Sequence, residues 1–231
     1  MALRKKLSQI DNMLDIILHA HDIVPQCRAV LMVLKELELD FTINEINLDK
    51  KEHLTTTFLR MNPLHTIPVY EERGFILTDS HAMSCFLIDD FSVGINPLYP
   101  KELSVRAMVN QYLVFEAAIM FPPVKRIILP LIMGEETSIS EEKIADCKEM
   151  FTSLDKVLEN KKWLATNSYS VADISCVATA SSVAILMDMD QYPNVKAWIR
   201  RCEEDILSYK EINEPGLKKL HALIRAALPS T

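Results

Sequence analysis

The residues best suited to chemistry lie between positions 62 and 84, in the run NPLHTIPVYEERGFILTDSHAMS. An Ile67-Pro68 step enters a β-prone segment there, and because proline cannot donate to a sheet ladder, it is expected at an edge and is sometimes cis. A cis bond would leave the backbone N–H and C=O of Ile67 open to an extended guest peptide. Farther on, Asp79-Ser80 offers a carboxylate, a hydroxyl and the free N–H groups of a helix start, which suit an anion. This spacing predicts a socket for a short peptide with a free amino-acid end.

The composition limits the partners of such a socket. The chain has 231 residues, 49% of them hydrophobic, which suits one large domain or two small ones with a sizeable core. Its net charge is −7 and no basic stripe is visible, so we expect no nucleic-acid partner. None of the four glycines falls in a phosphate-loop or dinucleotide fingerprint. No apolar run reaches the roughly 18 residues of a membrane span, so we expect no membrane partner.

The cysteines indicate a reducing compartment. Five are present, an odd number, scattered and without a Cys-x-x-Cys pair. This pattern argues against a disulfide framework and against a zinc site, so we expect no metal. The N-terminus has a basic start but no long apolar core or small-residue cleavage site, so we expect no secretory signal. The predicted location is the cytoplasm.

The socket residues need a sheet and a helix to position them, and the first ninety or so residues alternate in that way. The expected order is β-α-β-α-β-β-α, an α/β layer structure. The strands are predicted at 14–20, 41–46 (half-buried, by its alternation), 67–70 and 75–77, and the helices at 27–39, 52–59 and 80–91.

The second part of the chain reads as all-helical after a linker at 96–100. Helices are predicted over 101–134, 140–160, 170–186, 193–207 and 217–227. Pro122-Pro123 is expected to kink or break the first of these. Ser170 and Asp173 form a variant capping box before a helix that is apolar all round and therefore central. The predicted domains are 11–93 and 100–231.

Several motifs together carry a resemblance to a known family. They are CRAV at 27–30, INLDKKEHLTTTFLRMNPLHTIPV at 46–69, TDSHAM at 78–83, FEAAIMF at 115–121, SVADISC at 170–176 and YPNVKAWIRR at 192–201. In combination they resemble the cytosolic glutathione transferases, in detail the insect delta and epsilon classes and epsilon above all. The resemblance covers residues from about 14 to 220. It implies a thioredoxin-like N-terminal domain, a helical-bundle C-terminal domain, and conjugation of reduced glutathione, a co-substrate, to hydrophobic electrophiles in detoxification.

The resemblance also implies roles for the socket. The cysteinyl backbone of glutathione would pair with Ile67 ahead of a cis Pro68. Asp79 would hold the γ-glutamyl ammonium and Ser80 its carboxylate. The glutathione-binding residues implied are His53, His65, Thr66, Ile67, Pro68, Asp79, Ser80 and His81, with His53 and His65 at the glycyl carboxylate and His81 at the rim, toward a partner subunit in a homodimer. The hydrophobic-substrate pocket implied is Ile23, Val24, Phe115, Ile119, Phe121, Val124 and Leu217.

One position departs from the family pattern. A serine just before Pro-x-Cys-Arg donates to the glutathione sulfur in this family and favours the thiolate. Here that position is Val24, which cannot donate, and no Ser, Thr or Tyr occurs from His19 to Gln26. Losing such a donor costs roughly 1.5–3 kcal/mol of thiolate stabilisation. The start of the helix near Cys27 could compensate in part through its free N–H groups. The catalytic residue is therefore unknown, and weakened catalysis is expected.

Other interpretations stay open. Asp79-Ser80 could serve as a helix N-cap as well, and His53 and His65 could be merely solvated. The three aromatic and aliphatic candidates at 115–121 could be core. The protein could also be a glutathione-dependent carrier for hydrophobic, even sterol-like, ligands. LTDSHA at 77–82 resembles the steroid-pathway subgroup called noppera-bo, which places an acid in the electrophile pocket; the alignment puts Val124 there, with Glu116 as the only nearby acid.

Overall fold

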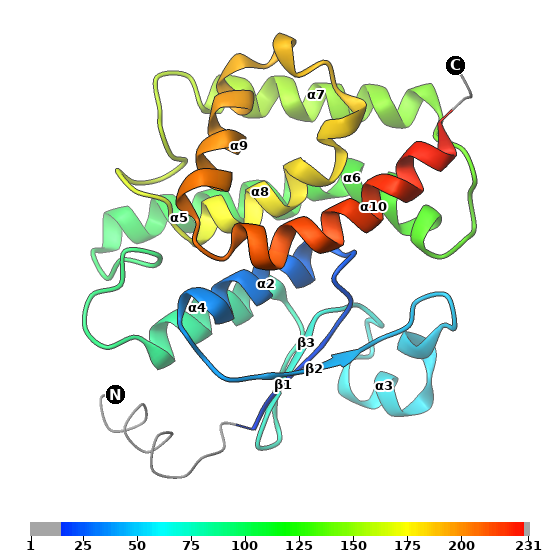
Figure 1. The fold of residues 1–231 in the computed structure, drawn as a ribbon. Helices are drawn as coiled ribbons and strands as arrows, with labels where there is room; N and C mark the ends of the chain where they lie inside the picture. The colour runs from blue at the N-terminus through cyan, green and yellow to red at the C-terminus, as the bar shows by residue number, and fades with distance from the viewer. Residues whose placement is uncertain (1–14, 229–231) are drawn as a thin grey trace.

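The computed structural model describes residues 15–228, and Figure 1 shows them as a sheet-containing part below a helical part. Predictions on residues 1–14 and 229–231 lie outside the described part of the chain. They are the absence of a secretory signal, Leu14 at the start of the first predicted strand, and the outer ends of both predicted domains.

A four-stranded sheet organises the first part, in the order β2-β1-β3-β4. The strands are β1 (Ile16–Ala20), β2 (Thr42–Glu45), β3 (Val69–Glu72) and β4 (Phe75–Leu77). β1 is parallel to β2 and antiparallel to β3, and β3 and β4 form an antiparallel hairpin. Arg73 and Gly74 close this hairpin with φ angles of 50° and 82°, the positive values that a tight hairpin turn requires.

Helices α2 (Pro25–Glu36) and α4 (Ser80–Phe91) pack against each other and lie between the sheet and the helical part (Figure 1). The short helix α3 (Thr56–Met61) follows a 3-10 turn and lies to one side. The predicted order β-α-β-α-β-β-α is confirmed. The half-buried second strand is wrong for β2 itself, whose four residues are exposed, Ile43 by 50%. The reason is that β2 is an edge strand, flanked only by β1 within the described sheet. Of the other two residues behind the prediction, Ile46 is buried and Phe41 packs against the core.

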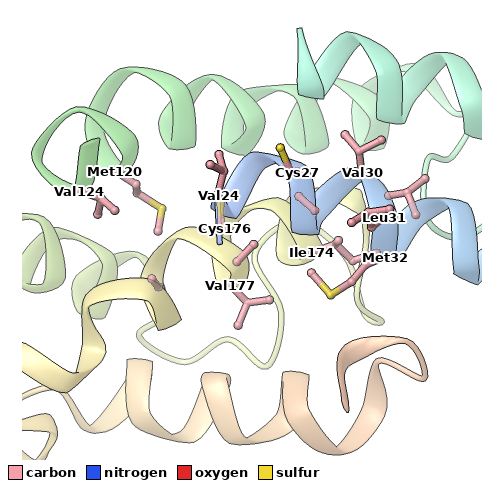
Figure 2. Close-up of a cluster of buried hydrophobic side chains, with 14 of the residues drawn as sticks. Val24, Cys27, Val30, Leu31, Met32, Met120, Val124, Ile174, Cys176 and Val177 are labelled. Atoms are coloured by element: carbon pink, nitrogen blue, oxygen red, sulfur yellow. The ribbon is translucent and has the colours of Figure 1, made fainter. Parts of the chain in front are cut away.

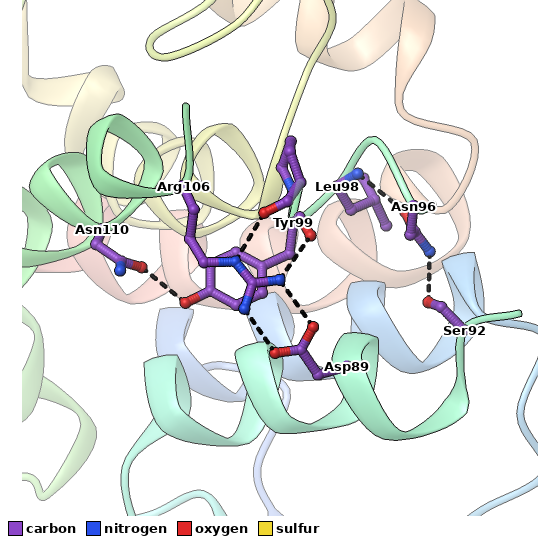
Figure 3. Close-up of polar contacts among 8 residues, drawn as sticks. Asp89, Ser92, Asn96, Leu98, Tyr99, Arg106 and Asn110 are labelled. Atoms are coloured by element: carbon purple, nitrogen blue, oxygen red, sulfur yellow. Dashed lines mark hydrogen bonds and ion pairs between the residues drawn. The ribbon is translucent and has the colours of Figure 1, made fainter. Parts of the chain in front are cut away.

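The predicted linker is pinned to both parts (Figure 3). Arg106 of α5 (Leu103–Phe115) donates to both oxygens of Asp89 on α4, at 3.0 and 2.9 Å. Its Nε donates to the Pro100 carbonyl at 2.7 Å, and its guanidinium carbon lies 4.1 Å from the centroid of the Tyr99 ring. These contacts join α4, the linker and α5.

Beyond the linker the described elements are helices, as predicted. After α5 come a π-helical segment (Glu116–Met120), α6 (Phe121–Ile132), α7 (Glu141–Val157), α8 (Val171–Val183), α9 (Pro193–Asp205), a second π-helical segment (Tyr209–Asn213) and α10 (Glu214–Ala227). The expected disturbance at Pro122-Pro123 takes the form of the first π-helical segment directly before them. The two prolines then stand in the first turn of α6, where their fixed φ angle suits the helix.

Helix α8 is the centre of the molecule, and every one of its residues is buried. Asp173 accepts bonds from the Ser170 N–H at 3.0 Å and from the indole of Trp198 at 3.0 Å. Burial raises the pKa of this carboxyl group, and these hydrogen bonds oppose the rise. Figure 2 shows side chains of α2, α8 and the 116–132 region meeting in one apolar cluster that includes Val24 and Val124.

Candidate functional site

A cavity of about 400 Å³ lies between the sheet-containing part and helix α6. Its volume falls in the range of small-molecule sites. One wall is polar, and all eight residues predicted to bind glutathione line it: His53, His65, Thr66, Ile67, Pro68, Asp79, Ser80 and His81. The opposite wall is mostly apolar and comes from α6. Residues from many points of the sequence therefore meet at one site that could hold two different ligands.

The loop that carries Ile67 is locked by its own side chains. Asn62 Nδ2 donates to the Thr66 carbonyl at 2.8 Å and lies 3.0 Å from the Thr66 hydroxyl. Asn62 Oδ1 accepts from the Leu64 N–H at 3.0 Å. The Ile67-Pro68 bond is cis, as predicted. Because the paired residues of β3 begin at Val69, Ile67 lies just ahead of the ladder, on the cavity wall.

Asp79 and Ser80 stand at the start of α4. Asp79 Oδ1 accepts the Ala82 N–H at 2.9 Å, so the interpretation of Asp79 as a helix N-cap is confirmed. Ser80 is buried and lines the cavity. A carboxylate and the N–H groups of a helix start thus face the cavity together, and this combination suits a zwitterionic amino-acid end.

The two predicted histidines lie next to each other on the polar wall. Their ring centroids are 6.4 Å apart. His53 is buried, so the solvated alternative is wrong for this residue. Its Nδ1 has no hydrogen-bond partner among the described residues. Burial lowers the pKa of His53, and the neighbouring His65 and Lys51 add to that shift. This nitrogen is itself closed off from solvent, so the part of His53 that a ligand can reach is the rest of the ring on the cavity wall.

Val24 occupies the N-cap of α2 and lines the cavity, without any side-chain cap. The two histidines that flank it in sequence point elsewhere. His19 lies 3.1 Å from Glu71 and 2.8 Å from Asn44, and His21 accepts the Ile23 N–H at 3.3 Å. Neither lines the cavity. Neither histidine thus takes the role of the missing serine. Gln26, two residues after Val24, does line the cavity, but its side-chain N–H donates to Glu116 at 3.3 Å.

Cys27, in the first turn of α2, is not a reactive thiol. It is fully buried, and burial raises the pKa of Cys27 to about 12. A thiol that stays protonated at neutral pH is a poor nucleophile. It packs as an apolar residue, as Figure 2 shows.

Sequence reasoning gave Glu116 too little weight. It is 1% exposed and borders the cavity. Its Oε2 lies 3.0 Å from His81 Nε2, and its Oε1 accepts from Gln26 Nε2 at 3.3 Å and from the Thr179 hydroxyl. His81 Nε2 also lies 2.8 Å from the Ser175 hydroxyl. The sequence did carry a signal for this residue, because Glu116 is a single acid inside the apolar run FEAAIMF. In the structure it begins a π-helical segment, and such segments recur at functional sites.

The apolar wall differs from the predicted pocket. Val24 and Phe121 line the cavity, but the other predicted pocket residues do not: Ile23, Phe115, Ile119, Val124 and Leu217. Val124 is 0% exposed in the core, and Ile119 is 48% exposed. The wall is instead one face of α6, with Lys125, Ile128, Leu129, Ile132 and Met133 following Phe121. The π-helical segment changes the helical register between α5 and α6, so faces extrapolated from α5 do not continue.

Within residues 15–228, no cluster of three or more His, Cys, Asp or Glu side chains could hold a metal ion. In the same residues, no helix combines the length and apolar character of a membrane span.

The fold and the cavity define a two-domain protein, thioredoxin-like and then helical, with a ligand site between the domains. Two domain families match it, the glutathione S-transferase N-terminal domain over residues 25–90 and the C-terminal domain over residues 116–205. The chain is 34% identical to glutathione S-transferase 1 of Manduca sexta over 204 residues, which is 86% of this chain and 92% of that protein. It belongs to the glutathione S-transferases, and within them to the insect delta and epsilon group.

Solved structures agree with this assignment. An epsilon-class glutathione S-transferase from the housefly, Musca domestica, is similar with a TM-score of 0.85 and 34% identity, over 92% of this chain and 98% of that one. A glutathione transferase homolog from Drosophila mojavensis with bound glutathione has a TM-score of 0.84 and 29% identity, over 95% and 100% of the two chains. The predicted fold class is confirmed.

Proposed function

We propose that this protein binds reduced glutathione on the polar wall of the cavity and transfers it to hydrophobic electrophiles held on the apolar wall. The observation that carries the proposal is the cavity itself, whose two walls have opposite character and come from different domains. The related structure with bound glutathione supports the choice of peptide. The transferase names of the relatives support the choice of reaction.

In this proposal, glutathione lies extended along the residues before β3. Its cysteinyl backbone pairs with Ile67, as a short added strand. The γ-glutamyl end meets Asp79 and Ser80 at the start of α4. The glycyl carboxylate reaches His53 and His65, and the position of both side chains on the cavity wall supports that placement.

The reaction needs the thiolate form of glutathione, which forms a C–S bond to the electrophilic carbon. The thiol proton is released to solvent, and the leaving group departs with the bonding electrons. Val24 cannot donate to the sulfur, so the uncapped N-terminus of α2 is left as the main source of N–H groups. The loss of the serine is worth roughly 1.5–3 kcal/mol. We therefore propose a weak transferase.

Conjugation of 1-chloro-2,4-dinitrobenzene tests the proposal, together with retention on glutathione resin. We expect both, with a slow rate, and a rise of about tenfold or more in Val24→Ser through a lower thiol pKa. Ultraviolet absorbance of the bound thiolate measures that pKa directly. A matched Val24→Ala variant controls for the change in size. No retention on the resin and no calorimetric heat at millimolar glutathione would contradict the proposal.

Val24 favours one second candidate, a glutathione-dependent carrier for hydrophobic ligands. Retention on the resin with conjugation at the uncatalysed rate would select it. The sterol-pathway variant gains no support from position 124, because Val124 lies in the core, and Glu116 is already bonded to three side chains. Titration with cholesterol or 17β-estradiol tests that variant.

We also propose that the protein is a homodimer. Within each chain, we propose domains over residues 11–93 and 100–231, on either side of the linker. A groove of about 430 Å³ between α4 and α5 supports a dimer. Met108 and Val114 of α5 and Ile119 of the π-helical segment that follows are exposed apolar residues that a second copy could cover. Analytical ultracentrifugation measures the oligomeric state.

The five unpaired cysteines support a cytoplasmic location, which fluorescence of a tagged chain can test.

A further inference from the structure

Lys125 is the unusual member of the apolar wall. Among the described residues it is the only lysine or arginine that lines the cavity. Phe121, Lys125, Leu129 and Met133 are spaced four residues apart and so form one ridge along α6. An ammonium group therefore stands between apolar side chains that would otherwise make a continuous surface for a hydrophobic ligand.

This ammonium group has no partner within residues 15–228: neither a hydrogen bond nor an ion pair joins it to another described side chain. Its neighbour Arg126 shows the contrast, since it pairs with Glu142 at 3.0 Å and with Asp146, both on α7. The other charges on the cavity wall are also engaged. Asp79 caps α4, and Glu116 contacts His81; neither carboxylate makes an ion pair with Lys125.

The position of Lys125 is that of a selectivity group rather than a core residue. Its side chain is exposed while it borders the cavity, so the ammonium group lies where the apolar wall meets solvent. A ligand can thus lay an apolar body along the ridge and keep a charged group at the mouth. Low-dielectric walls strengthen the attraction between that group and the lysine relative to open water.

We propose that the second substrate is an amphipathic anion, with an apolar, electrophilic body on the α6 ridge and a carboxylate, sulfonate or sulfate at Lys125. This rests on the proposed transferase function and narrows its substrate class. The charged group in this pocket is therefore a cation, whereas the steroid-pathway subgroup places an acid in its pocket to contact a sterol hydroxyl.

Two matched aryl chlorides test the reaction. 4-Chloro-3,5-dinitrobenzoate is anionic, and its methyl ester is neutral; in both the thiolate forms the C–S bond and chloride leaves with the bonding electrons. Lys125→Met should raise KM for the anion about three- to tenfold while leaving KM for the ester unchanged. Lys125→Arg should keep the preference. Lys148→Met, which removes an equal charge from exposed α7 away from the cavity, is the control.

A binding measurement separates this inference from the proposed reaction. Fluorescence titration with 8-anilinonaphthalene-1-sulfonate, an apolar body with a sulfonate, needs no turnover. Wild-type affinity should fall about threefold or more between 0.05 and 0.5 M salt, and the salt dependence should vanish in Lys125→Met. Absence of conjugation with this pattern intact would refute the transferase and leave the anion preference standing. The preference would be overturned if Lys125→Met raised KM equally for the ester and the anion, or for neither. Salt-independent binding of the sulfonate by the wild type would overturn it too.

Discussion

The two walls of the cavity are built in different ways. The polar wall uses short segments whose conformation is set close by in sequence, such as the Asn62–Thr66 hydrogen bonds and the Asp79 cap on Ala82. The apolar wall uses one face of α6, whose orientation depends on a π-helical segment and on packing against α7, α8 and α10. A wall made of local motifs can be recognised in a sequence. A wall made by the register of a long helix depends on everything that the helix packs against.

Removal of Arg28 should have the largest effect, because this buried side chain joins the sheet-containing part, which carries the polar wall, to the helical part, which carries the apolar wall. It donates to the Ile23 carbonyl at 2.8 Å beside the cavity turn, and to Ser182 at 2.6 Å and Asn213 at 2.7 Å in the helical part. Arg28→Met strands these acceptors, so the free energy of unfolding should fall by about 3 kcal/mol or more. Urea denaturation measures it. Arg28→Lys should recover part of the loss, and an unchanged midpoint in Arg28→Met would show that the two parts, each with its wall, are stabilised independently.

Asp79 tests the polar wall further, because it caps helix α4 and is also proposed to bind the γ-glutamyl ammonium of glutathione. Asp79→Ala should lose about 1 kcal/mol of stability with the cap, and about tenfold or more in glutathione affinity with the charge. Asp79→Asn keeps a capping oxygen, so it should lose affinity while remaining nearly as stable. Thermal denaturation and calorimetry with glutathione give the two quantities. If Asp79→Asn binds glutathione as the wild type does, Asp79 is only a cap.

A pair of variants on α6 tests which face forms the apolar wall. Leu129→Ala should raise KM for a neutral aryl chloride about fivefold, because roughly 1 kcal/mol of apolar contact is lost, with glutathione affinity unchanged. Val124→Ala should instead lower stability by about 1–2 kcal/mol and leave KM unchanged, since Val124 is core. Steady-state kinetics and denaturation distinguish them. The reverse pattern would return Val124 to the pocket.

The smallest expected effect is the pH response of His53. Its pKa in the folded protein is lowered from 6.5 by burial, with His65 and Lys51 contributing. The unfolded chain therefore takes up this proton more readily, and stability should fall as the pH drops through about 6.5. Bound glutathione should raise the pKa of His53, so binding at a pH of about 6 should take up protons. Calorimetry in two buffers of different ionisation enthalpy detects this uptake. His53→Asn should abolish it; uptake that persists would move the glycyl carboxylate elsewhere.

The amino-acid sequence by itself determined the order of elements in the first part of the chain, the helical character of the second, and the Ile67-Pro68 and Asp79-Ser80 positions of the polar wall; the histidines of that wall came from the resemblance of the motifs to the family. These features rest on short-range chemistry: a proline at a strand entry, an acid at a helix start, an alternation of apolar residues. They appear in the sequence because their causes lie within a few residues of each other.

Only the tertiary structure decided the apolar wall and the contacts of Glu116. Val124 and Leu129 are both apolar residues of α6, yet one is core and the other faces the cavity, because the π-helical segment sets which side of α6 meets the sheet-containing part. Glu116 meets His81, Gln26 and Thr179 from three other elements, at separations that no local pattern carries. Lys125 likewise became a candidate selectivity group only when the fold placed it on the ridge without a partner within the described residues. Long-range packing decides such positions, since the same residue types satisfy the helix equally well on either face.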